Sequence, residues 1–120
     1  MPRASVSSEV VHGNTILSRT ADYGAVTVTI DASKVTPVSG KKIVPAGTFL
    51  GGVGGSIMRE GAKAQPLNGE ETEGLAFNEV DVTDGDMEVA MLYRGTVGLD
   101  RIPAAPNEDV NLPRVTFTKD

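Results

Sequence analysis

The residue types that carry most enzyme chemistry are almost missing from this chain. Its 120 residues include one histidine, His12, and no cysteine. A catalytic histidine needs an orienting partner and a pocket, and the polar, small-residue segment around His12 suggests neither. The Gly-x-Ser-x-Gly elbow that presents a nucleophilic serine is also missing from the sequence. We therefore expect no enzymatic activity, no catalytic residues and no bound cofactor.

Carboxylates gather in one stretch of the chain, at Glu79, Asp81, Asp84, Asp86 and Glu88. Clustered carboxylates can bind calcium, but their spacing does not follow the Asp-x-Asp-x-Asp-Gly loop. The pair Asp84-Gly85 is a strong signal for a two-residue hairpin turn. We expect a turn with outward-facing carboxylates and no metal, with a calcium site as the alternative.

A glycine-rich stretch covers residues 51–55, of which four are glycine. A loop that cradles phosphate would end in lysine followed by serine or threonine, whereas Ser56-Ile57 follows here. The sequence therefore predicts a flexible bend that opens no helix.

The net charge of −5 weakens any non-specific attraction to nucleic acid or anionic membranes. Nucleic-acid-binding sheets interleave basic and aromatic residues, and Tyr93-Arg94 is an isolated pair of that kind. No apolar run approaches the ~18 residues of a membrane span, and residues 1–11 lack the apolar centre of a secretory signal. We expect no nucleic acid, no membrane partner and synthesis in the cytoplasm of the producing cell.

The elements that must position these residues are short strands. Fourteen glycines, seven prolines and brief alternating runs predict a mostly β protein, a small β-barrel or sandwich-like single domain with an extended N-terminal arm. A turn is expected at residues 45–47, an exposed loop at 59–74 and a single helical turn at 107–110. The last strand should lie at a sheet edge, because Pro113 cannot donate a ladder hydrogen bond. The expected strands cover residues 25–32, 41–44, 48–50, 75–83, 87–94 and 114–118.

The centre of the predicted core is the hairpin around Asp84-Gly85. Alternation on both sides of this turn predicts one shared apolar face, and the second strand carries apolar residues on both faces, as a central strand does. The expected core residues are Met87, Val89, Met91 and Tyr93, with Val80 and Val82 opposite them.

Residues 1–24 are predicted to form an N-terminal arm that precedes a β-rich domain at residues 25–120. The arm has too little apolar content to fold alone, yet it carries two apolar pairs, Val10-Val11 and Ile16-Leu17. We expect the arm to become ordered on a partner, with these four residues in the contact. A frayed terminus is the alternative.

Four segments, in this order, resemble the small head decoration proteins of tailed bacteriophages, which include the lambda type. The resemblance covers about residues 25–118. The four segments are Lys41-Lys42-Ile43-Val44-Pro45-Ala46-Gly47-Thr48, the run from Gly74 to Asp86, Arg94-Gly95-Thr96-Val97 and Leu112-Pro113-Arg114-Val115-Thr116-Phe117.

The resemblance implies a viral structural protein that binds the major capsid protein on the outer surface of the virion. It also implies a homotrimer that stabilises the shell. The chain departs from the family in its long N-terminal segment and in a short link before the last strand, which bear on the mode of attachment. Two alternatives stay open: another phage subunit, such as a tail-tube or head-completion protein, and a free-standing β-barrel that binds carbohydrate.

Overall fold

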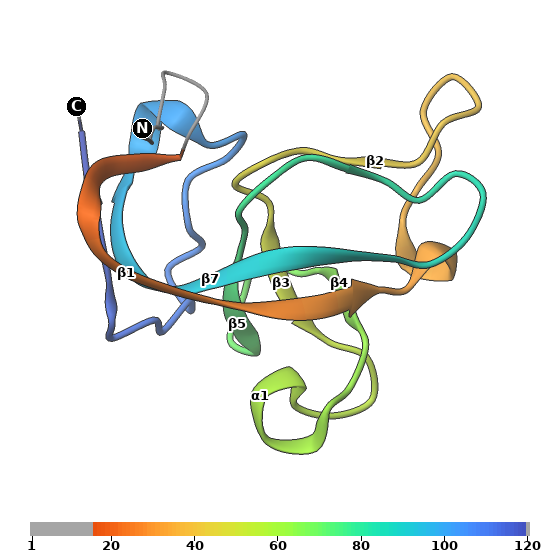
Figure 1. The fold of residues 1–120 in the computed structure, drawn as a ribbon, viewed down its shortest axis with the longest axis horizontal. Coiled ribbons are helices and arrows are strands. Elements are labelled where there is room, and N and C mark those ends of the chain that lie inside the picture. The colour runs from red at the N-terminus through yellow and green to blue at the C-terminus, as the bar shows by residue number, and fades with distance from the viewer. Residues whose placement is uncertain (1–15, 120) are drawn as a thin grey trace, which may run out of the picture.

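The structure is a computed structural model that describes residues 16–119, with residues 18–22 described by their backbone alone. The described chain forms one mostly β domain, as predicted (Figure 1). Two long strands, β1 (Leu17–Ile30) and β7 (Met87–Gly98), run antiparallel beside one another across the molecule. The other elements pack around this pair.

Five strands close into a barrel. β1 pairs with β4 (Ala64–Pro66), β4 with β3 (Phe49–Gly52), β3 with β5 (Thr72–Ala76) and β5 with β7, and β7 returns to β1. Closure depends on a short seam between β1 and β4, where Ile30 pairs with Ala64 and the N–H of Asp31 donates to the Ala64 carbonyl at 2.9 Å.

The strand β1 begins at Leu17, eight residues before the expected start at residue 25. Its register with β7 shifts between Leu17 and Arg19, between Arg19 and Gly24, and between Gly24 and Ala25. Such bulges bend and twist a strand, and they hide the two-residue alternation by which strands are recognised. Gly24 allows a close approach, because a Cβ there would lie 2.9 Å from the Tyr93 ring. The boundary of the predicted arm at residue 24 is corrected accordingly.

The predicted hairpin across Asp84-Gly85 does not form. A turn is present, with the N–H of Gly85 donating to Val82 O at 3.2 Å, but the flanking segments pair elsewhere. The short strand β6 (Val80–Asp81) pairs with β2 (Ile43–Val44), and β7 pairs with β5. The chain leaves the sheet after β5, makes the β2–β6 ribbon and returns as β7.

The core has two clusters of buried apolar side chains, and β7 contributes side chains to both. Val89 and Met91 belong to the first cluster together with Val80 and Val82, which confirms these four predicted core residues. Met87 was a wrong prediction, because half of its surface is exposed where β7 begins. Tyr93 is only partly buried. The second cluster contains the following buried residues: Ile16, Leu17, Phe49, Leu75, Leu92, Val97 and Val115.

Two further predictions about the segment 51–74 were wrong. The glycine-rich stretch does lead into a helix, α1 (Ile57–Glu60), which begins directly after Ser56. Gly52 is required at the end of β3, because a Cβ there would collide with the Gly55 carbonyl oxygen. The expected exposed loop contains β4 and the start of β5.

The C-terminal part runs along the outside of the barrel. After the 3-10 helix η2 (Leu99–Arg101), the chain reaches β8 (Val115–Thr118), which pairs in parallel with β7. β8 lies at the end of the strand order, as predicted for the last strand. Residues 107–110 form a hydrogen-bonded turn and no helix, and a second 3-10 helix, η1 (Ala32–Lys34), follows β1.

Candidate binding surfaces

The four residues predicted to contact the capsid are divided by the structure. Val10 and Val11 lie outside the described residues, as does His12. Ile16 and Leu17 are each 1% exposed in the second core cluster, and the N–H of Gly98 donates to Ile16 O at 3.0 Å. Their side chains are therefore part of the core in this conformation, and this part of the contact prediction is corrected.

The carboxylates of the 79–88 stretch serve separate hydrogen bonds. Asp81 accepts hydrogen bonds from the backbone N–H and the hydroxyl of Thr83. These two bonds, and the one from the hydroxyl most of all, hold the pKa of Asp81 below its usual range. The carboxylate of Asp86 lies beside Lys63, the residue that precedes β4. Within residues 16–119, no three His, Cys, Asp or Glu side chains come together in a way that could hold a metal ion.

Asp86 and Lys63 form a polar cluster at the barrel seam. Lys63 Nζ lies 2.6 Å from Asp86 Oδ2, and the N–H of Ala32 donates to Asp86 Oδ1 at 2.8 Å. The hydrogen bond from Lys63, followed by that from Ala32, lowers the pKa of Asp86, and the same carboxylate raises the pKa of Lys63. Lys42 Nζ donates to the Ala32 carbonyl at 3.0 Å. The cluster joins the end of β1 to the starts of β4 and β7, so its arrangement is structural.

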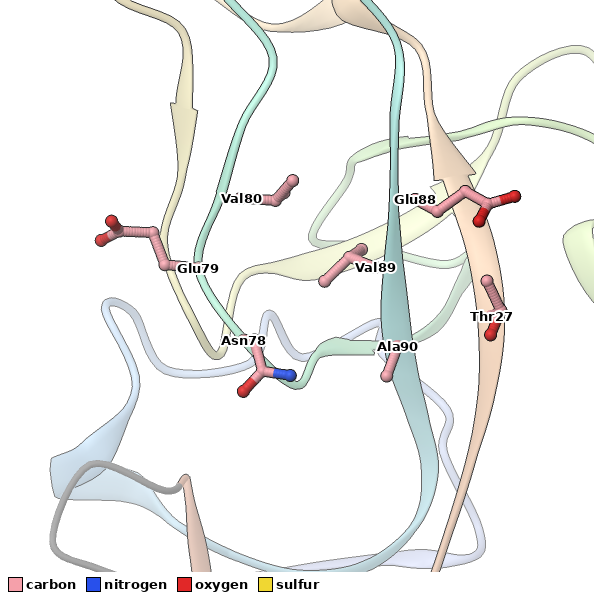
Figure 2. Close-up of a pocket in the computed structure, with 7 residues that line it drawn as sticks. All are labelled: Thr27, Asn78, Glu79, Val80, Glu88, Val89 and Ala90. Carbon is pink, nitrogen blue, oxygen red and sulfur yellow. The ribbon is translucent and has the colours of Figure 1, made fainter.

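A shallow hollow of about 340 Å³ lies between β1, β7 and the segment before β6 (Figure 2). Val80 and Val89 point towards one another across it, whereas the carboxylates of Glu79 and Glu88 point away to opposite sides. Paired acid–base chemistry needs two carboxylates that face one reacting centre. The hollow therefore offers a small apolar contact and no catalytic pair.

A second, more apolar pocket of about 280 Å³ lies beside β3, between Phe49, Leu67 and Pro103. Asn68 holds the neighbouring loop in place: its Nδ2 donates to Ala105 O at 3.0 Å, and its Oδ1 accepts from the N–H of Asn107 at 2.7 Å. The pocket is thus a junction between the barrel and its C-terminal segment.

A more voluminous depression, about 1250 Å³, is a groove between α1, the loop before β5 and residues 111–114. We call it the α1 groove. Its wall is fixed by Glu73, whose carboxylate accepts from the N–H groups of Ile57 and Met58 and from the Ser56 hydroxyl at 2.7–3.0 Å. The Ser56 hydroxyl in turn caps the helix by accepting from the N–H of Arg59, and the Glu60 carboxylate accepts from the N–H of Ser56. The positive end of this short helix is therefore already neutralised by the protein's own carboxylates.

The capping residues show what the sequence prediction missed. A serine directly before the apolar pair Ile57-Met58 is an N-cap signal for the start of a helix, and it could have been recognised directly after the glycines. The role of Glu73 has no such local signal, because it lies 16 residues from Ile57 and reaches it only in the folded chain.

Comparison of this chain with protein-family models, curated proteins and solved structures gives no match. In the part of the chain that the structure describes, no helix has the length and apolar character needed to cross a membrane.

Proposed function

We propose that this protein is a head decoration protein of a tailed bacteriophage, which binds the outer capsid surface as a homotrimer and stabilises the shell. The observation that carries the proposal is the arrangement of the four resembling segments. β2, in the first, pairs with β6, in the second, and Gly47 N donates to Ala76 O at 2.7 Å. β5 joins the second segment to β7, whose residue Gly95 pairs with Val115 in the fourth.

The four segments therefore form one connected part of the fold, although they are dispersed along the sequence. This connection supports a shared fold as the origin of the resemblance, and the function is proposed on that basis.

The physics of the role also suits a small domain of this kind. A decoration protein occupies many equivalent sites, so a modest affinity per protomer suffices when three protomers bind together. The contact segment that we propose is residues 1–15, which carry Val10 and Val11 and precede β1 directly. Such a segment can add a strand to a sheet edge of the major capsid protein.

The proposal is tested by adding the purified protein to undecorated heads and measuring bound protein by sedimentation and electron microscopy. The full chain should bind at regular sites on the outer surface. Val10→Asp with Val11→Asp should weaken attachment, because the added charges oppose burial of both side chains. The matched control places the same charges at Ser7 and Ser8 and should bind normally.

Two results would count against parts of this proposal. Failure of the full-length protein to bind heads would refute the decoration function. Binding of the Val10 and Val11 variant as tight as that of the control would move the capsid contact from residues 1–15 to the barrel.

The carbohydrate-binding alternative has one observation in its favour. Tyr23 is 42% exposed, and its ring centroid lies 5.3 Å from that of Phe77. Exposed aromatic rings can stack on sugars, but Phe77 packs against the second core cluster. Binding to a glycan array that is lost in Tyr23→Ala would favour this alternative.

A further inference from the structure

The turn between η1 and β2 ends in a rigid tip. Within residues 38–41, Val38 and Lys41 exchange two backbone hydrogen bonds of 2.8 and 3.0 Å, while Ser39 and Gly40 have φ values of 54° and 79°. Two central residues with positive φ define the compact turn that suits tight hairpins. A rigid turn loses little conformational entropy when it binds. We call this turn, which consists of residues 38–41, the 38–41 tip.

This tip combines an exposed apolar residue with positive charge. Val38 is 73% exposed, the highest value among the large apolar side chains that the structure describes. Lys34 and Lys41, four residues before Val38 and three after it, are both exposed, and residues 32–42 contain no acidic residue although the protein is acidic overall. Lys41 also contributes to the lowered pKa of Asp81, so part of its charge acts within its own chain.

The α1 groove has the complementary character. Met58, 47% exposed, lines the groove together with Leu112 and Tyr93. Four glutamates and two arginines line the same groove, which leaves a net charge of −2: Glu60, Glu70, Glu71, Glu73, Arg59 and Arg114. Glu70 and Glu71 are exposed on the loop before β5, where their carboxylates can form ion pairs with lysines.

The two surfaces cannot meet within one molecule. Figure 1 shows the tip as the amber turn that projects beyond β2, with α1 on the opposite side of the barrel. We infer that the 38–41 tip of one copy docks into the α1 groove of a second copy. Val38 then contacts Met58 and Leu112, while the lysines beside it face Glu70 and Glu71.

A contact between two different surfaces of identical chains is heterologous, and it generates a ring when the rotation between copies closes. Each copy then uses one tip and one groove. This inference deepens the proposed function, because it names the surfaces through which copies in the proposed trimer touch. The self-association can nevertheless be tested without any capsid.

The absence of cysteine from the chain makes crosslinking a clean test. Val38→Cys and Met58→Cys are prepared as separate proteins with tags of different size, mixed, and treated with a short bismaleimide. The matched control replaces Met58→Cys by Met87→Cys, because Met87 has nearly the same exposure, 50% against 47%. We expect a mixed Val38–Met58 product in clear excess over the Val38–Met87 product. Equal yields of the two products would overturn the inference.

A charge exchange provides the second measurement. Lys34→Glu with Lys41→Glu should weaken self-association in sedimentation equilibrium by between about twofold and thirtyfold, the range expected for the loss of two exposed ion pairs. Glu70→Lys with Glu71→Lys in the same chain should restore it. All four positions are exposed, so melting temperatures should change little, the attraction between Lys41 and Asp81 being a contribution within the chain that is lost. Unchanged self-association of the Glu-substituted variant, or no rescue, would overturn the proposed orientation.

The outcomes separate this inference from the proposed function. Specific Val38–Met58 crosslinking in a protein that does not bind heads would support the contact and refute decoration. Regular decoration by a protein without this crosslink would refute the contact and leave decoration in place.

Discussion

Replacing Leu17 by alanine tests whether the N-terminal half of β1 belongs to the folded domain. Leu17 is 1% exposed, pairs with Val97 and packs in the cluster that includes Val115. Removing a buried leucine side chain costs about 2–5 kcal/mol, because transfer free energy is lost and a cavity is left. Such a loss is a large share of a total stability of about 5–15 kcal/mol.

The corresponding change in melting temperature can be worked out from the chain length. With about 2.1 cal/mol/K per residue, the unfolding entropy of this chain is about 0.25 kcal/mol/K. A loss of about 3 kcal/mol then lowers the melting temperature by about 12 °C. The assay is thermal and urea unfolding followed by far-ultraviolet circular dichroism, which needs no tryptophan.

Met87→Ala is the matched control, because Met87 is a large apolar residue with half its surface exposed. It should change stability by less than about 1 kcal/mol. A Leu17→Ala variant that melts within about 2 °C of the wild type would refute the reasoning. The strand would then begin later, and residues up to 24 would belong to an arm after all.

Three further predictions concern the core, the seam and the α1 groove. Val89→Asp should leave the chain unfolded in circular dichroism, because an unpaired carboxylate would be buried in the first cluster; a soluble variant with unchanged melting would contradict this. Because the pKa of Asp86 is lowered in the fold, the stability it contributes is present above the ordinary carboxyl pKa and is lost on acidification. Its partner Lys63 has a raised pKa, so that contribution is lost only as the pH rises through the folded value. Asp86→Asn should therefore flatten the acid limb of a pH–stability curve, and an unchanged limb would refute the link. Glu73→Ala should speed hydrogen exchange at the Ile57 and Met58 amides, because both donate to its carboxylate; exchange as slow as in Glu71→Ala, at an exposed position, would contradict that role.

The sequence by itself determined the fold class and much of the local structure. Alternation at Val26, Val28 and Ile30 marked the regular half of β1, and Pro45-Ala46-Gly47 marked a turn in which Thr48 N donates to Pro45 O. The apolar residues on both faces of β7 marked a central strand, and the structure places them in two separate clusters. These features depend on neighbours in the chain, so a local pattern records them.

Only the tertiary structure decided the partners of the strands and the extent of the core. The pattern of residues 80–82 fits a hairpin with β7 equally well, yet β6 pairs with β2, from which it is distant in sequence. The pair Ile16-Leu17 stands alone among polar neighbours, and the burial of Leu17 requires Val97 and Val115. Glu73 is an ordinary acidic residue until the fold brings it to α1. In each case the deciding contact joins residues far apart in the chain. The contact forms only when folding brings these residues together, so no local pattern can record it.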